Sequence, residues 1–465
     1  MFDLKTSLHL SGFGFEKEGE KMKELFTKKE LKALIIPLVI EQVLAMTVGI
    51  ADTMMISYAG EAAISGVSLV DMINNLLISI FAAISTGGAV IISQYLGSKN
   101  RLKACESAGQ LMVVTALISL GIMTLTLVFR RPILTVLFGS IEPDVMSSAM
   151  TYLLLSAYSY PFLAVYNSGA AMYRSMGNSR VPMYISAGMN VINIVGNAIL
   201  IFGFGMGVAG AALATLAARA TAAVVQTVLV TKKKNDVYIE RASVFHWNGG
   251  MIKRILSIAL PNGVESGIFQ GGRVIVVSII AGFGTAQIAA NAVANSLDSM
   301  GILGGSAMNL AMITVIGQCI GSGDTEQAVS YTKRLLKITY MIIGATCITL
   351  LVFLGPILNF YTLSREARRL SVTLIWIHDG LAIFFWPLSF TLSYALRAAG
   401  DIKYTMIISV FSMFMFRIVF SFVLGVHFGM GAIGVWIAMV IDWLFRSGCY
   451  VQRFVRGKWK HFHLI

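Results

Sequence analysis

Long apolar stretches recur along the whole chain and are separated by short polar segments. Most are at least as long as the roughly 20 residues that a helix needs to cross the hydrocarbon core of a bilayer. Because lipid offers no hydrogen bonds to the main chain, such runs predict helices. The pattern predicts an all-α polytopic membrane protein with twelve transmembrane helices, at 32–57, 64–96, 107–129, 148–172, 181–203, 207–231, 252–281, 288–319, 331–354, 370–396, 403–427 and 430–454.

The second half of the chain repeats the first half, with equivalent residues about 224 positions apart. The first stretch needs no gap and aligns Pro37 with Pro261, Glu41 with Glu265, Gly60 with Gly284, Gln94 with Gln318, and Gly97 with Gly321. Further on, Arg174 aligns with Arg397. Each half holds about six spans, which predicts two pseudo-symmetric six-helix bundles of the same orientation. Substrate sites in such folds lie near mid-membrane between the repeats.

The repeat and the polar segments divide the chain into two lobes joined by a linker. We predict a cytoplasmic N-terminal tail at 1–29, an N-terminal six-helix lobe at 30–231, a cytoplasmic linker at 232–251, a C-terminal six-helix lobe at 252–455 and a cytoplasmic tail at 456–465. Met22 is an alternative start, so residues 1–21 are expected to be a mobile tail or an upstream reading of the start codon.

The net charge of +13 follows from the orientation in the membrane. With both termini in the cytoplasm, about 27 of the 36 Lys and Arg residues lie on the cytoplasmic side and about five lie outside. We therefore expect a multi-pass protein of the plasma or inner membrane, and the basic charge requires no nucleic-acid partner.

Composition excludes several other classes of protein. Hydrophobic residues make up 56% of the chain and charged residues only 13%, which is about half of what a soluble domain of this size carries. The four cysteines form no CxxC pattern, so we expect no disulfide framework, no zinc site and no cofactor. The chain has no GxxxxGK[ST] motif, which is the motif that binds ATP phosphates. We therefore expect an ion gradient to supply the energy for transport. HExxH and GxSxG motifs are also missing, which argues against a membrane-embedded enzyme.

Two motifs resemble the multidrug and toxic compound extrusion (MATE) family of cation-coupled efflux transporters. They are the first span, IPLVIEQVLAMTVGIADTMMISYAG, and the paired loops YRSMGNSRVP and LRAAGDIK after the fourth and tenth spans. The resemblance covers roughly residues 30–455. It implies a cation site in the N-terminal lobe, formed here by Asp52, Asn193, Asn197 and Thr215. Many members carry Asp at the position of Asn197, and the single carboxylate left here suits proton exchange or a weaker Na⁺ site equally well.

Five further acidic residues within the predicted spans are candidates for a substrate site or a second ion site, because ionisable groups in lipid are costly. Glu41 and Glu265 each follow a proline by four residues. They either bind a cation or pair with a basic loop residue at a cytoplasmic gate. An internal Glu265–Arg273 pair is a further alternative.

Asp71 and Asp298 belong to polar clusters that the repeat relates. These clusters are expected either to face each other across a cavity or to hydrogen-bond between helices. Asp379 adjoins His378, a pair able to relay protons. We expect the remaining span residues to form structural pairs near helix ends, namely Arg219, Arg417, Asp442 and Arg446.

These observations predict a secondary active transporter, not an enzyme. We expect it to exchange H⁺ or Na⁺ for small organic compounds, often cationic or amphipathic, by rocking its two lobes, and to act as a monomer in the lipid bilayer. The alternative is a lipid-linked oligosaccharide flippase of related architecture. Its cavity should be lined with arginines, yet only about four Arg lie within the spans. A channel is a further alternative without a filter-like motif to support it.

Overall fold

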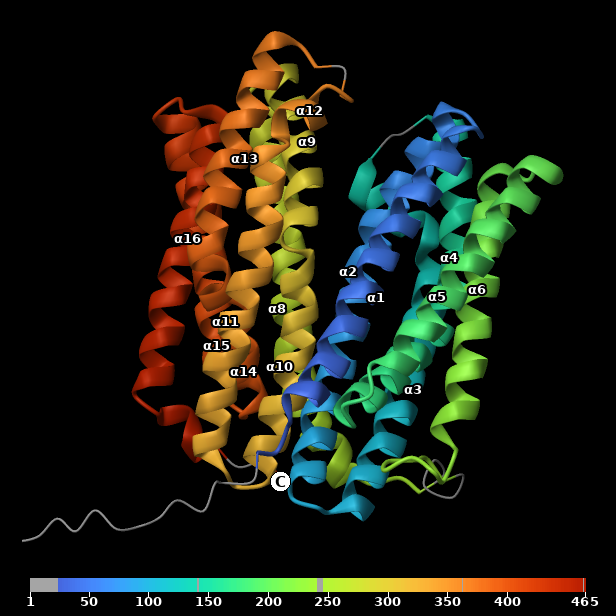
Figure 1. Ribbon diagram of the computed structural model, residues 1–465. Helices are drawn as coiled ribbons and strands as arrows, with labels where there is room; N and C mark the ends of the chain where they lie inside the picture. Colours follow the sequence, from blue (N-terminus) through green and yellow to red (C-terminus); the bar gives the residue numbers. More distant parts are fainter. Residues whose placement is uncertain (1–23, 140–141, 241–245, 362, 463) are drawn as a thin grey trace, which may run out of the picture.

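The computed structural model describes residues 24–139, 142–240, 246–361, 363–462 and 464–465, and every regular element in these ranges is helical. Residues 1–23 of the predicted tail and residues 241–245 of the predicted linker lie outside the described residues. The N-terminal half contains α1 (Lys28–Ser57), α2 (Glu61–Gly97), α3 (Arg101–Phe138), α4 (Pro143–Ser175), α5 (Arg180–Asn197), the π-helical segment η1 (Ala198–Gly203) and α6 (Gly207–Val230) (Figure 1).

The C-terminal half has more interruptions within its helices. It contains α8 (Gly249–Ala281), α9 (Thr285–Gly301), α10 (Leu303–Gly321), α11 (Thr325–Val352), α12 (Leu354–Leu358), α13 (Arg365–Trp386), η2 (Pro387–Thr391), α14 (Leu392–Ala398), α15 (Ile402–Ser412), η3 (Met413–Val419), η4 (Ser421–His427), α16 (Gly431–Val455) and the short 3₁₀ turn η5 (Lys458–His461).

Among the described residues, eleven helices are long and apolar enough to cross a membrane. They include composite helices in which a π-helical segment continues the α-helix, such as Arg180–Gly203 and Ile402–His427. The remaining predicted span, 148–172, lies within α4, which is 33 residues long and packs against α2, α3 and α6. The all-helical polytopic fold predicted from the sequence is confirmed.

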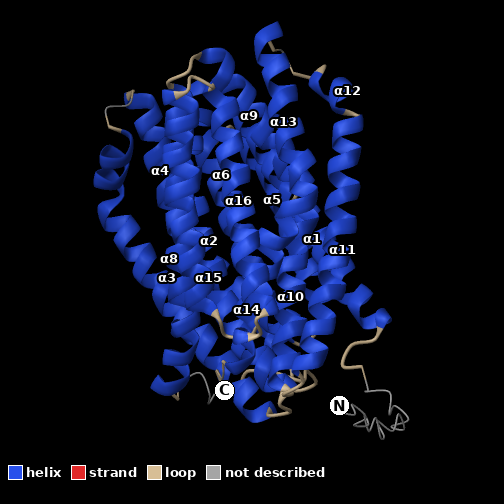
Figure 2. Ribbon diagram, turned by 90° about the vertical axis from the view of Figure 1, so that its left-hand side faces the viewer, coloured by secondary structure: helices blue, strands red, loops and turns tan. Residues whose placement is uncertain are grey.

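The helices form two bundles that lie side by side (Figure 1). The N-terminal lobe consists of α1 to α6 and the C-terminal lobe of α8 to α16. Contacts between the lobes involve mainly α1 and α2 on one side and α8 and α10 on the other. The bundles are close together at the end where both termini lie, here called the terminal face, and they diverge toward the opposite end (Figures 1 and 2).

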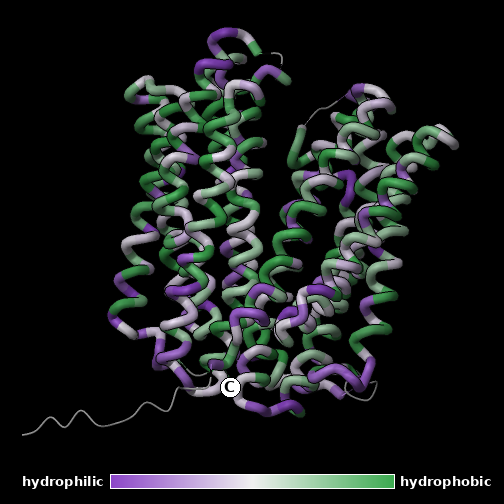
Figure 3. The backbone as a smooth tube through the Cα atoms, in the orientation of Figure 1, coloured by the Kyte–Doolittle hydropathy of each residue, from purple (hydrophilic) through white to green (hydrophobic). Residues whose placement is uncertain are grey.

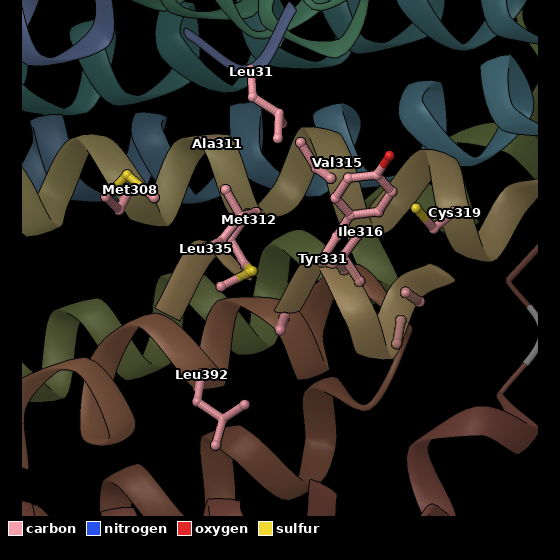
Figure 4. Close-up of a cluster of buried hydrophobic side chains, with 14 of the residues drawn as sticks. Leu31, Met308, Ala311, Met312, Val315, Ile316, Cys319, Tyr331, Leu335 and Leu392 are labelled. Carbon is pink, nitrogen blue, oxygen red and sulfur yellow. The ribbon is translucent and has the colours of Figure 1, made fainter. Parts of the chain in front are cut away.

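The hydropathy of the chain follows this arrangement. Apolar residues dominate the middle of the helices, and polar residues gather at the ends and in the connections (Figure 3). Near the terminal face, a buried cluster joins the lobes, in which Leu31 of α1 packs with Met308, Met312 and Val315 of α10 (Figure 4). This apolar contact stabilises the closed end of the molecule.

Turns at equivalent places in the two halves have the same backbone conformation. Gly60 and Gly284 precede α2 and α9 with φ of 103° and 102°, a region that residues with a Cβ rarely adopt. Asn100 and Asp324 cap α3 and α11, each accepting a hydrogen bond from the main-chain N–H three residues later. These shared turns show that the sequence repeat is also a structural repeat.

One difference between the halves lies in the second helix of each lobe. The sequence predicts a continuous span at 288–319, equivalent to α2, but α9 ends at Gly301 and α10 begins at Leu303. The hydroxyl of Thr346 in α11 donates a hydrogen bond to the main-chain oxygen of Gly301 over 2.6 Å. A side chain from a neighbouring helix therefore satisfies a carbonyl at the break, which explains how the interruption is tolerated within the membrane.

The terminal face is closed by a reciprocal contact between α2 and α10. A Cβ added to Gly97 would collide with the main chain of Gln318, and one added to Gly321 would collide with the main chain of Gln94. The side-chain amide of Gln94 donates to the carbonyl of Ala398 at the end of α14 over 2.8 Å, and that of Gln318 donates to Ser175 at the end of α4 over 2.7 Å. Both glutamines thus bind the end of a helix in the opposite lobe.

Candidate functional site

The four residues of the predicted cation site lie together in the N-terminal lobe. The amide nitrogen of Asn197 donates a hydrogen bond to Oδ1 of Asp52 over 2.6 Å and lies 3.4 Å from Oδ1 of Asn193. The amide of Asn193 donates to the hydroxyl of Thr215 over 3.0 Å. Three helices, α1, α5 and α6, therefore contribute polar side chains to one cluster. Asn193 and Asn197 are one turn apart on α5, which places both on the same face.

The cluster offers oxygen atoms to a small cation. Asn197 is fully buried, and its Oδ1 has no hydrogen-bond partner among the described residues. A buried carbonyl oxygen beside a carboxylate is an arrangement that binds hard cations such as Na⁺. Asn197 is also the last residue before the π-helical segment η1, and π-helical turns are often found at functional sites.

Asp52 and Thr215 line a cavity of about 280 Å³ that also contains Asp71 and Arg219. The amide of Asn74 approaches Oδ1 of Asp71 over 3.3 Å. Arg219 donates a hydrogen bond to the hydroxyl of Ser159 over 2.7 Å, so it points into the bundle. The sequence had led us to expect it in a pair near a helix end. Two carboxylates face one guanidinium group in this cavity. We call it the acidic cavity.

Glu41 and Glu265 both form ion pairs with an arginine of the paired loop motifs. Arg174 lies 2.5 Å from Glu41, and Arg397 contacts both carboxylate oxygens of Glu265 at 2.6 and 2.8 Å. All four side chains are at most 15% exposed. Of the alternatives open from the sequence, pairing with a basic loop residue is the one observed. The pairs are equivalent by the repeat, and each joins the first helix of a lobe to the end of its fourth span.

The other acidic candidates of the C-terminal lobe gather around one histidine. Nδ1 of His378 lies 2.8 Å from Oδ1 of Asp379, and its Nε2 contacts Oδ1 of Asp298. Trp436 and Trp443 pack edge-on against the imidazole ring. Both ring nitrogens therefore face a carboxylate oxygen, and an imidazole nitrogen that carries a proton can donate a hydrogen bond to such an oxygen. The ligand atoms also lie within 4.8 Å of one another, which would allow a cation in place of the protons.

This cluster changes the prediction made for Asp71 and Asp298. The repeat led us to consider that their two polar clusters face each other across one cavity. Asp71 instead lines the acidic cavity of the N-terminal lobe, whereas Asp298 binds His378 inside the C-terminal lobe. The repeat aligns Asp71 with Asn295 and Asp298 with Asn74, so the two acids occupy different positions of the related clusters and have different partners.

A second cavity, of about 210 Å³, lies where the C-terminal lobe meets α2. We call it the arginine pocket and define it by Arg273, Arg397, Arg446, Glu265, Phe269 and Phe390. Arg446 lies 3.9 Å from Asp442, which gives the expected pair, but it is only 2% exposed and so lies inside the lobe. The sequence indicated too few span arginines for an arginine-lined cavity, but packing brings those of three helices together. Hydropathy could flag each residue but could not show that they converge.

The sequence pattern of the MatE family matches this chain twice, at residues 37–199 and at residues 261–423. The two matches begin and end 224 residues apart, as does the repeat seen in the sequence and in the fold. The chain belongs to the MatE family. It is therefore a member of a transporter family and not an enzyme, as the sequence predicted.

Proteins similar to this MATE transporter over most of their length include bacterial transporters. A protein of Thermotoga maritima named probable multidrug resistance protein NorM is 29% identical over 443 residues, which are 93% of each chain. An uncharacterized transporter of Bacillus subtilis, YisQ, is 28% identical over 89% of this chain and 90% of its own.

Solved structures show the same fold. A MOP superfamily transporter from Pyrococcus furiosus, whose title describes a reversed polarity of its binding pocket, superimposes with a TM-score of 0.85 at 21% identity, covering 92% of this chain and 95% of that one. A MATE transporter described in an outward-facing conformation gives a TM-score of 0.83 with the same coverage and identity. At this identity the likeness establishes the MATE fold.

Proposed function

We propose that this MATE transporter is a secondary active efflux protein that exchanges H⁺ or Na⁺ for small organic compounds, and that Asp52 carries the coupling ion. The observation that supports this most directly is the contact of Asp52 with Asn197, whose buried Oδ1 has no hydrogen-bond partner in the part of the chain that the structure describes. Relatives named as probable multidrug resistance proteins support organic compounds as the cargo.

The proposed cycle moves the ion and the substrate in opposite directions. We place the terminal face in the cytoplasm, because the excess of Lys and Arg lies in the segments at that end. In the described conformation the lobes touch at that face, which corresponds to an outward-open state. Binding of a cation at Asp52 neutralises a carboxylate in a low-dielectric bundle, which changes the relative stability of the outward- and inward-open states.

Either ion fits the residues present. A proton needs only the carboxylate of Asp52, and Na⁺ would add oxygen atoms of Asn193, Asn197 and Thr215. The ion supplies the gradient energy, and the chain supplies a site whose occupancy is tied to lobe movement. Coupling arises because ion and substrate favour different states of one two-state element.

Efflux in everted membrane vesicles, with Na⁺ and pH gradients imposed separately, tests this proposal. We expect one of the two gradients to drive dye movement in the wild-type protein and neither to drive it in Asp52→Asn. Asp144→Asn, at the exposed start of α4, is the matched control and should behave as wild type. Unchanged gradient-driven transport by Asp52→Asn would refute the role of this carboxylate.

A lipid-linked oligosaccharide flippase is the second candidate, and the arginine pocket is the observation that favours it. Guanidinium groups bind pyrophosphate strongly. A flippase of this kind would move a lipid pyrophosphate across reconstituted bilayers, whereas the proposed antiporter would move soluble dyes. An assay of both cargoes in the same proteoliposomes separates the two functions.

A further inference from the structure

The two lobes carry polar cavities of opposite charge. The acidic cavity has two carboxylates, Asp52 and Asp71, and one guanidinium group, Arg219. The arginine pocket has three guanidinium groups and one carboxylate, Glu265. Glu265 directs both of its oxygens at Arg397, at 2.6 and 2.8 Å, and so is already engaged. Arg273 and Arg446 therefore provide an excess of positive charge in the pocket.

Arg446 is buried without adequate partners. Its Nε and Nη1 have no hydrogen-bond partner among the described residues, and its Nη2 reaches the carbonyl of Ser389 only over 3.4 Å. Nη1 lies 3.9 Å from Oδ2 of Asp442, too far for a hydrogen bond. Asp442 is shared with Arg417, at 3.6 Å, and also accepts from the hydroxyl of Ser412. A buried guanidinium group so weakly bonded is costly unless a ligand completes its hydrogen bonds.

Aromatic rings hold the guanidinium group in place. Cζ of Arg446 lies 4.5 Å from the ring centre of Phe390 and 5.4 Å from that of Phe269. Stacking of this kind restrains the plane of the guanidinium group while leaving its edge free for an anion. The same two rings give the pocket an apolar wall. A ligand that matches both features has an oxyanion group attached to an apolar body.

The pocket also lies at the junction of the lobes. Ser79 of α2 contributes to its lining, and the amide of Gln270 in α8 approaches the hydroxyl of Ser79 over 3.3 Å. A movement of one lobe against the other would change this wall. The volume of about 210 Å³ is below the roughly 300–1,000 Å³ of sites that enclose a drug-sized molecule, so the pocket fits a head group and not a whole substrate.

We propose that the arginine pocket binds the oxyanion head group, such as a carboxylate, sulfonate or phosphate, of an amphipathic organic anion. The inference rests on the proposed transport function and names a substrate class for it. The apolar body of the ligand lies against Phe269 and Phe390 and extends between the lobes. Ion binding in the acidic cavity and anion binding in the arginine pocket then act on different lobes of the same two-state element.

Binding of a matched pair of probes tests the pocket. Naphthalene-1-sulfonate and (1-naphthyl)trimethylammonium would be titrated by calorimetry into the full-length protein in phosphatidylcholine nanodiscs. We expect the sulfonate to bind the wild-type protein. Arg273→Gln should lower the affinity for the sulfonate at least about tenfold, which is the loss that one charge-assisted hydrogen bond produces. Arg446→Gln should have the same effect. Arg456→Gln, at the exposed end of α16, is the control and should bind as wild type.

The outcomes separate the pocket from the proposed function. The inference would be overturned if the sulfonate failed to bind the wild-type protein, or if it bound Arg273→Gln as tightly as it binds the wild-type protein. Because Arg273 is exposed, this variant should fold. Competition by phosphatidylglycerol in the nanodiscs would identify a lipid phosphate as the natural oxyanion. If phosphatidylglycerol does not compete, the natural ligand is a soluble organic anion. Asp52→Asn should retain sulfonate binding, so a failure of ion coupling leaves this result unaffected.

Discussion

Gln94 and Gln318 occupy equivalent positions in the two halves, and each donates its side-chain amide to a helix-terminal carbonyl of the opposite half. The glycines three residues later allow the main chains of α2 and α10 to meet. The closed terminal face thus depends on a small, nearly symmetric set of polar contacts, supported by the apolar cluster around Leu31. Such a contact is able to open and close without rearrangement inside either lobe.

The first prediction concerns this closure. Gln94→Ala combined with Gln318→Ala should lower the population of the closed terminal face, because two inter-lobe hydrogen bonds worth about 1 kcal/mol each are lost. Cys319, buried beside Gln318, is the reporter once Cys105, Cys347 and Cys449 are replaced by Ser. We expect faster maleimide labelling of Cys319 from the terminal side. Gln452→Ala, on the exposed face of α16, is the control and should leave the labelling rate unchanged. A double variant in which Cys319 is labelled as slowly as in the wild-type background would contradict a role of the two glutamines in closing the terminal face.

The second prediction concerns the buried ion pair of Glu265 and Arg397. Glu265→Gln leaves a buried guanidinium group without its carboxylate, which should destabilise the protein by about 3–5 kcal/mol. The double variant Glu265→Gln with Arg397→Met removes the unpaired charge and should recover part of the loss. Thermal unfolding in detergent measures both, with Arg365→Gln as an exposed control. Equal stability of the wild-type protein and the single variant would show that the pair contributes little.

The third prediction concerns the cation site. Asn197→Asp places a second carboxylate beside Asp52, and two like charges at this distance favour binding of a cation between them. We expect the Na⁺ concentration needed for half-maximal thermal stabilisation to fall about tenfold, because Na⁺ gains one additional attraction to a carboxylate. Asn190→Asp, a buried position on the same helix outside the cluster, is the control. No difference between the two variants would argue against Na⁺ at this site.

The fourth prediction concerns His378. His378→Gln leaves Asp298 and Asp379 buried without a cation between them. The folded variant then favours carboxylates that carry protons, so its loss of stability should be large at pH 8 and smaller at pH 5.5. Melting curves at both pH values measure the difference. His427→Gln, at an exposed helix end, serves as control, and a loss that does not depend on pH would mean that the imidazole acts by packing alone.

The membrane fold and its division into two halves follow from the amino-acid sequence. Hydropathy is a local property, and lipid requires each helix to satisfy its own main chain, so span positions follow from composition within a short window. The repeat in the sequence pairs Gly60 with Gly284 and Gln94 with Gln318. The cluster around Asp52 was named through a resemblance to a family, since no spacing along the chain brings Asp52 to Asn197, 145 residues away.

Which polar side chains contact one another depends on how the helices pack in three dimensions. Asp71 lines the acidic cavity and Asp298 contacts His378, although both belong to polar clusters that the repeat relates. Arg446 faces a pocket and not the membrane surface because Phe269 and Phe390 come from other helices to cover it. Inside lipid, polar groups find partners on neighbouring helices, and that choice depends on rotation and packing, which a sequence pattern of one helix does not contain.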